Sequence, residues 1–172
     1  MVGISGSDGL PTVATLAGVS GLKSGDRVGY ATGPLGAYAS ARLFPADRLI
    51  RLPDALGDEA AAAVLFKGIT AQYLLKTTGQ VKQGSRVLIY GAAGALGQLM
   101  CAWAKHLGAQ VLGVVSKPAS VERAKAAGCD HVFVFEAQSL PSQVMQATQG
   151  QKVDVVYDSI GKDTFLASLD CL

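Results

Sequence analysis

Three glycines, each separated by two residues, constrain this chain more than any other feature of its sequence. Gly91, Gly94 and Gly97 directly follow the apolar run 87–90 and precede an apolar stretch with helical spacing, 96–107. This order predicts a strand, a tight turn and a helix. Glycines let a ligand approach the backbone and a helix N-terminus offers free N–H groups, so the pattern favours a dinucleotide pyrophosphate site. A glycine turn that only packs the helix against the strand is the alternative.

From residue 85 onward, strand and helix signals alternate along the chain. Strands are expected over 86–90, 110–115, 131–135 and 153–157, and helices over 96–107, 120–127, 140–148 and 162–169. Near-continuous apolar strands separated by helices imply parallel βαβ units that are buried on both faces. The predicted fold class is α/β, with a partial doubly wound, Rossmann-like parallel sheet of about four strands.

The first third of the chain has a different character. Residues 1–20 are rich in Gly, Ser and Thr and are expected to form loop. Short antiparallel strands, too few for an independent core, are expected over 27–31, 37–43 and 47–52. The Ala-rich segment 58–75 predicts a helix that Gly68 divides with a bend. We therefore expect a partial β-rich segment, 1–56, and a dinucleotide-binding domain, 57–172, that is incomplete at its C-terminus.

The end of the second predicted strand of that domain bears on which dinucleotide binds. In NAD-binding folds, an acidic residue about 20 residues after the glycine turn holds the ribose 2′-hydroxyl. Here the strand ends at Ser116 and Lys117, and the next carboxylate is Glu122. A hydroxyl and a positive charge suit a 2′-phosphate better, which favours NADP(H). Alternatively, Ser116 caps the following helix and Lys117 is a solvated loop residue, and both interpretations can hold together.

Two further segments leave alternatives open. By composition alone, residues 67–73 are ordinary helix surface with a packing glycine. Asp158 follows the fourth strand, at the sheet edge where ligands bind in open α/β folds, and it serves equally well as a cap of the next helix.

Composition excludes several classes of function. Cys101, Cys129 and Cys171 form no C-x-x-C pair, and neither His106 nor His131 has zinc-finger spacing from them. We expect reduced, mostly buried thiols, no metal site and a cytoplasmic location. No apolar run approaches the roughly 18 residues of a membrane span. The net charge is +2 and the basic residues are scattered, which argues against nucleic-acid binding.

Four motifs occur in the order and spacing of a known family. They are Gly25-Asp26-Arg27-Val28, Lys67-Gly68-Ile69-Thr70-Ala71, Gly91-Ala92-Ala93-Gly94-Ala95-Leu96-Gly97 and Asp158-Ser159-Ile160-Gly161. From about residue 21 to 172, the chain resembles the zinc-free quinone oxidoreductases of the medium-chain dehydrogenase/reductase superfamily, which include zeta-crystallin. The resemblance makes the β-rich segment a remnant of a GroES-like antiparallel β domain. It implies NADPH as the cofactor and hydride transfer to a quinone or a related conjugated carbonyl.

The resemblance also assigns site residues. It implies nicotinamide-side contacts from Thr70 and Tyr73, pyrophosphate contacts from Ala95 and Leu96, 2′-phosphate contacts from residues 116–120, and a contact near Ser159. The predicted cofactor-binding set is therefore Thr70, Tyr73, Gly91, Gly94, Ala95, Leu96, Gly97, Ser116, Lys117, Ser120 and Ser159. No catalytic residue is assigned, because no side chain is a compelling proton donor.

Two positions depart from the family pattern near the 2′-phosphate. The family usually carries a lysine at the position of Ser120 and a tyrosine at that of Phe135. We expect Lys117 to compensate for the first change.

Length is the larger departure, because family members are about twice as long. This difference in length predicts that the chain is truncated at both ends. The fourth strand would then form an open apolar edge of the sheet, which a second copy in a homo-oligomer such as a dimer would cover. Two functions stay open. One is an NADPH-dependent quinone reductase, and the other is a catalytically inactive dinucleotide-binding or structural, oligomerising protein.

Overall fold

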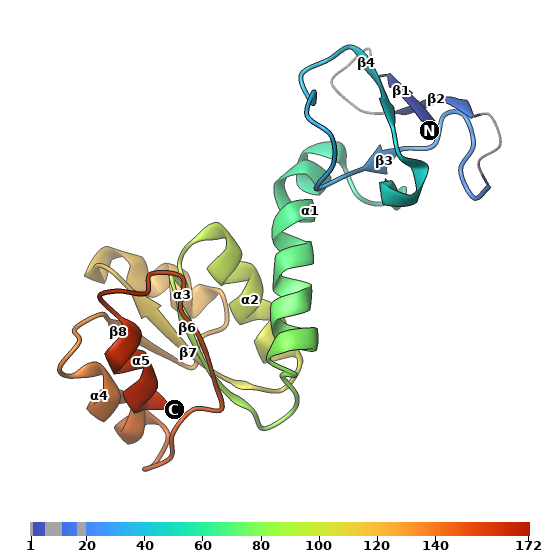
Figure 1. The fold of residues 1–172 in the computed structure, drawn as a ribbon. Helices are drawn as coiled ribbons and strands as arrows, with labels where there is room; N and C mark the ends of the chain where they lie inside the picture. The colour runs from blue at the N-terminus through green and yellow to red at the C-terminus, as the bar shows by residue number, and fades with distance from the viewer. Residues whose placement is uncertain (1, 6–11, 17–19) are drawn as a thin grey trace. The chain divides into compact units, whose positions relative to one another are not determined.

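The chain forms two compact units, Met1–Phe66 and Lys67–Leu172. Within them, the computed structural model describes residues 2–5, 12–16 and 20–172 (Figure 1). The domain boundary that we place between residues 56 and 57 stays a prediction.

The first unit is built from short antiparallel strands. Strand β1 (Val2–Ser5) lies between β2 (Thr12–Leu16) and β4 (Ala41–Phe44), and β3 (Val28–Gly29) pairs with β5 (Ile50–Arg51). This confirms the expected small antiparallel sheet. The strands are too short to enclose a large core, and among the residues of this unit whose burial is described, Val28 and Phe44 are fully buried.

Two expectations for this unit are wrong. Residues 2–5 and 12–16 are strands rather than loop, because β1 pairs with β4 some forty residues away. Such a distant partner leaves no local trace in a Gly- and Ser-rich sequence. The other predicted loop residues, 6–11 and 17–19, lie outside the described part of the chain. The segment expected as a strand over 47–52 begins instead with a 3₁₀ turn, Ala46–Arg48, that follows Pro45.

The Gly25-Asp26-Arg27-Val28 motif has a structural role in this unit. Asp26 accepts hydrogen bonds from Lys23 N at 2.9 Å and from Arg51 Nη2 at 2.8 Å. Arg27 Nη2 donates to Leu56 O at 2.6 Å and pairs with Asp58 at 2.5 Å. These bonds tie β3 to the start of the following helix.

Helix α1 (Asp58–Gln72) runs unbroken through Gly68, so the expected bend there is wrong. A single glycine costs a helix about 1 kcal/mol but does not end it. The geometry changes further on, in the π-helical segment η2 (Tyr73–Thr78). Its widened turn closes with a hydrogen bond from Gly79 N to Leu74 O at 2.8 Å.

The second unit contains the predicted parallel sheet. Its strand order is β8-β7-β6-β9, and all neighbours are parallel. The strands are β6 (Arg86–Tyr90), β7 (Gln110–Val115), β8 (His131–Val134) and β9 (Val155–Tyr157), and the helices are α2 (Ala95–His106), α3 (Val121–Ala126), α4 (Leu140–Ala147) and α5 (Phe165–Cys171). The Rossmann-like α/β class is thereby confirmed.

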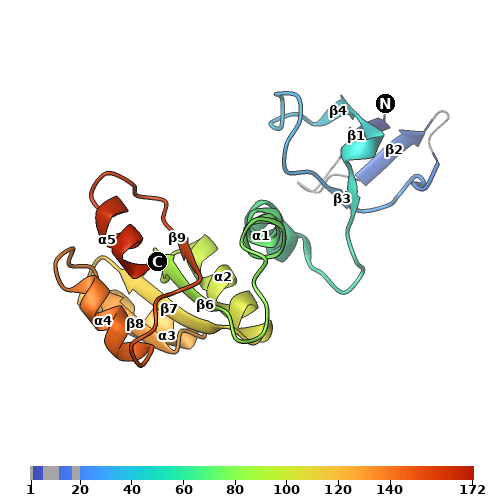
Figure 2. The same ribbon diagram turned by 60° about the horizontal axis from the view of Figure 1, so that its bottom comes forward.

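The packing of strand β6 explains why the strands of this sheet are continuously apolar in sequence. Val87 and Ile89 belong to an apolar layer that includes residues of α2 and α3. Leu88 and Tyr90 belong to a second layer with residues of α4 and α5 (Figure 2). Alternate side chains thus enter opposite cores, so both faces of the strand must be apolar.

The three thiols are free and buried, as expected. Cys101 Sγ and Cys129 Sγ lie 3.3 Å apart within the layer formed with α2 and α3. Among the described helices, none is long and apolar enough to cross a membrane.

Candidate dinucleotide-binding site

Each glycine of the Gly91–Gly97 turn meets a different physical demand. Gly91 has φ +62°, in the left-handed region that side chains disfavour. A Cβ on Gly97 would lie 2.8 Å from Ala92 Cα and closer still to Gly91 O, so only glycine lets α2 pack this near the strand. Gly94 precedes α2 in extended conformation and donates its N–H to Gly91 O at 2.8 Å. These local constraints account for glycine at all three positions, and a phosphate-binding role for the turn stays a prediction.

The start of α2 offers hydrogen-bond donors to a ligand. Its N-cap, Gly94, has no side chain to cap the helix, and Gln98 N–H is the donor that reaches Gly94 O, at 2.9 Å. The N–H groups of the first turn consequently have no intrahelical acceptor. Together with the helix dipole they favour an anion here.

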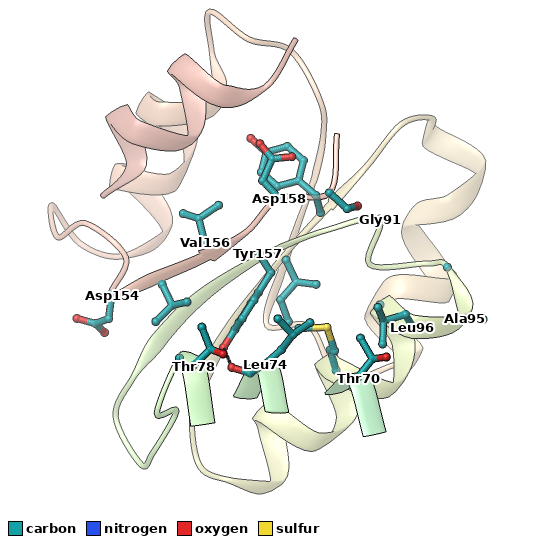
Figure 3. A pocket seen from close by; sticks show the side chains of 18 of the residues that line it. Thr70, Leu74, Thr78, Gly91, Ala95, Leu96, Asp154, Val156, Tyr157 and Asp158 are labelled. Carbon is teal, nitrogen blue, oxygen red and sulfur yellow. Dashed lines mark hydrogen bonds between the residues drawn. The ribbon is translucent and has the colours of Figure 1, made fainter. Parts of the chain in front are cut away.

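A cavity of about 1000 Å³ opens in front of this turn. Three segments of the second unit line it: the α1–η2 stretch through Thr70 and Leu74, the glycine turn, and the end of β9 at Tyr157 (Figure 3). It runs along the whole of β9 and reaches the carboxyl ends of β6 and β9, where the strand order reverses and ligands bind in open α/β sheets.

Tyr157 connects two walls of this cavity. Its hydroxyl donates to Leu74 O at 2.9 Å, as the dashed line in Figure 3 marks. Burial raises the pKa of the Tyr157 phenol, so it stays neutral and keeps its donor proton. Its ring lies so close to Gly79 that a Cβ there would be 3.1 Å from Cζ and would overlap the hydroxyl. The π-helical turn and β9 are thus fitted to one another.

Asp158 is held by four donors at the sheet edge. Its Oδ1 accepts from the backbone N–H groups of Ile160 at 2.8 Å and Gly161 at 3.2 Å. Its Oδ2 accepts from Thr164 Oγ1 at 2.6 Å and Ser168 Oγ at 2.9 Å. Burial raises the pKa of this carboxyl, but the hydrogen bonds outweigh it and hold the pKa below its usual value. Asp158 lines the cavity, and its carboxylate also orders the turn into α5.

A second cavity, of about 300 Å³, adjoins the first and shares Gly91 and Gly94 with it. Its lining also includes Ser116 and Ser120, as predicted, and Arg123, which sequence reasoning missed. Arg123 lies three residues after Ser120, on the same side of the helical segment. This helical spacing could have indicated Arg123, but the sequence favoured Lys117 because it directly follows Ser116 at the end of the strand.

The structure brings together nine of the eleven predicted site residues. Thr70, Gly91, Gly94, Ala95, Leu96, Gly97 and Ser159 line the larger cavity, and Ser116 and Ser120 line the smaller. Tyr73 and Lys117 are not among the lining residues of either cavity, and Tyr73 is 47% exposed. Thr70, Leu74 and Thr78 recur every four residues on the cavity side, which leaves Tyr73 off that face. The individual roles stay predictions.

Comparison with known proteins agrees with this geometry. Residues 95–172 match the family described as zinc-binding dehydrogenase. A quinone oxidoreductase of Pseudomonas aeruginosa is 43% identical over 168 residues, which cover 97% of this chain and 52% of that protein. A 2-haloacrylate reductase of a Burkholderia species is 48% identical over 157 residues, covering 90% of this chain and 47% of that protein.

Solved structures give the same relationship. Escherichia coli quinone oxidoreductase, crystallised with NADPH, superposes with a TM-score of 0.86 at 42% identity, over 94% of this chain and 50% of that one. Over its own length the chain is therefore similar to proteins named quinone oxidoreductase. It spans about half the length of the curated relatives it matches.

One expectation about the relationship is corrected, and one is not tested. The match over 97% of the chain includes most of residues 1–20, for which we expected no resemblance. Among the described residues, no group of three or more His, Cys, Asp or Glu is placed to hold a metal ion. The prediction of a zinc-free protein stays a prediction.

Proposed function

We propose that this chain carries the cofactor-binding part of an NADPH-dependent oxidoreductase that reduces a quinone or a related conjugated carbonyl. The single observation that carries the proposal is the pair of adjoining cavities that share Gly91 and Gly94. A dinucleotide needs such an extended site, with its pyrophosphate at the glycine turn and a nucleoside half on either side.

In this proposal the chain supplies binding and orientation. The first-turn N–H groups of α2 receive the pyrophosphate, because they lack intrahelical acceptors. Apolar side chains of the larger cavity, among them Ile89, Met100 and Val156, exclude water from the nicotinamide half. NADPH, when bound, supplies the hydride.

The substrate class rests on the relatives. Proteins named quinone oxidoreductase are 43% and 46% identical to this chain, and one named 2-haloacrylate reductase is 48% identical. Quinones and acrylates share a carbon–carbon double bond conjugated with a carbonyl group. We therefore propose this electrophile as the common feature of the substrate.

Two measurements on the 172-residue chain test the proposal. Titration of NADPH, followed by its fluorescence, should reveal saturable binding. Oxidation of NADPH, followed at 340 nm with 1,4-benzoquinone, should be enzyme-dependent and slower with NADH. Binding without turnover would contradict the enzymatic proposal for this chain and favour the non-catalytic alternative. Absence of binding would contradict the proposed cofactor as well and leave only the structural, oligomerising alternative.

The homodimer and the cytoplasmic location remain predictions. Strand β9 lies at the edge of the described sheet, and Phe165, Leu166 and Leu169 of α5 are 47–75% exposed. These features support association with a second copy, which sedimentation equilibrium measures.

A further inference from the structure

Arg123 contributes the positive charge of the smaller cavity. The lining of this cavity combines its side chain with the hydroxyl-bearing Ser116 and Ser120 and with the backbone of the glycine turn. No aspartate or glutamate is among the lining residues. A cavity lined by a guanidinium and two hydroxyl groups, without a carboxylate, has the chemistry of a phosphate site.

The guanidinium of Arg123 is available to a ligand. Within the described part of the chain it makes no hydrogen bond or ion pair, whereas the adjacent Glu122 is paired with another residue. Glu122 pairs with Lys125 at 3.0 Å, and Asp130 pairs with Lys105. Neither of these carboxylates is paired with Arg123.

The location of the cavity specifies which phosphate it receives. The smaller cavity shares Gly91 and Gly94 with the larger one and reaches Val115, the last residue of β7. In dinucleotide folds the end of this second strand faces the 2′ position of the adenosine ribose. A side chain at this place therefore determines whether a cofactor with a 2′-phosphate or one with a 2′-hydroxyl binds more tightly.

We propose that Arg123 is the residue that selects NADPH over NADH, by binding the 2′-phosphate together with Ser116 and Ser120. This inference rests on the proposed cofactor and replaces Lys117 in the role that the sequence suggested for it. The planar guanidinium binds phosphate through two parallel N–H groups, which a lysine cannot do. Lys117 is exposed and is not among the residues that line the cavity.

The experiment compares dissociation constants for NADPH and NADH in four proteins: the unaltered chain, Arg123→Ala, Arg123→Lys and Lys117→Ala. The unaltered chain should bind NADPH more tightly. Arg123→Ala should raise the Kd for NADPH at least about tenfold, the loss of a charged hydrogen bond, and change that for NADH less than about twofold. Arg123→Lys should keep part of the preference, because the charge remains. Lys117→Ala is the matched control and should change both constants little.

Each other outcome separates this inference from the proposed function. Equal affinity of the unaltered chain for both cofactors overturns the inference and leaves dinucleotide binding intact. A selective loss in Lys117→Ala, or an equal loss for both cofactors in Arg123→Ala, also overturns it. Binding of neither cofactor by the unaltered chain overturns the proposed function and the inference with it. Because Arg123 is exposed and unbonded within the described residues, circular dichroism should report an unchanged fold.

Discussion

Replacing Gly97 by alanine tests the close packing of α2 against the strand that precedes it. The new Cβ would lie 2.8 Å from Ala92 Cα and nearer still to Gly91 O, which are backbone atoms that cannot rotate away. The helix start must therefore shift, and overpacking of this kind costs about 1–3 kcal/mol. Alanine favours a helix over glycine by about 1 kcal/mol, which offsets part of that cost.

Gly68→Ala is the matched control for this perturbation. Gly68 also lies within a helix, but a Cβ there would meet nothing within 4 Å. It has the same propensity gain without the overlap, so we expect about 0.5–1 kcal/mol of added stability. The two variants should consequently differ by about 1–3 kcal/mol in free energy of unfolding.

Urea unfolding followed by the fluorescence of Trp103 measures this difference. Trp103 is the sole tryptophan of the chain and lies on α2 itself, so its signal reports the affected unit. NADPH titration is a second readout, since a shifted helix start would misplace the N–H groups that we propose bind the pyrophosphate. Equal midpoints and slopes for the two variants would refute the packing argument.

Three further predictions concern the cavity walls. Tyr157→Phe should cost about 0.5–1 kcal/mol in urea unfolding, because Leu74 O keeps its hydrogen bond from Gly79 N at 2.8 Å after the phenol is lost. Gly79→Ala should destabilise the fold by about 1–3 kcal/mol, because the new Cβ would overlap the Tyr157 hydroxyl. Adding Tyr157→Phe to the same chain should recover part of this loss. Strictly additive free energies in the double-mutant cycle would show that the two residues do not interact. Asp158→Asn should cost about 1–2 kcal/mol at pH 7, because its amide N–H₂ faces the Thr164 and Ser168 hydroxyls. The hydrogen bonds lower the pKa of Asp158 in the folded chain, so this stabilisation is complete above about pH 4–5 and is lost as the pH falls through that lowered pKa. A difference in stability between wild type and variant that does not decrease with falling pH would contradict the assignment.

The parallel sheet could be predicted because its signals are local. The strands β6 and β7 have the bounds expected from their apolar runs, Gly91 lies in the expected tight turn, and Gly97 lies in the first turn of the expected helix. Burial on both faces requires a continuous apolar sequence, so such a strand can be recognised without knowing which strand it pairs with. The same reasoning failed for β1 and β2, whose strand character comes from pairing with β4.

The candidate site likewise contains residues that local sequence predicts and residues that only tertiary packing brings in. The glycine turn, Ser116 and Ser120 follow from sequence order, since strand ends and helix starts are covalently linked. Which neighbours fill the surrounding space does not follow from it. Leu74 rather than Tyr73 lines the larger cavity, and Arg123 rather than Lys117 lines the smaller one, because the direction of each side chain depends on the path of the backbone.

By itself, the sequence determined the α/β class, the glycine turn before α2 and the similarity to quinone oxidoreductases, because each depends on residues that are near one another along the chain. Only the tertiary structure decided that Tyr157 contacts Leu74, that Asp158 is held by α5, and that Arg123 faces the smaller cavity. Those contacts join segments separated by up to 83 positions, or depend on the direction of a single side chain. Packing decides both, and no local pattern encodes them.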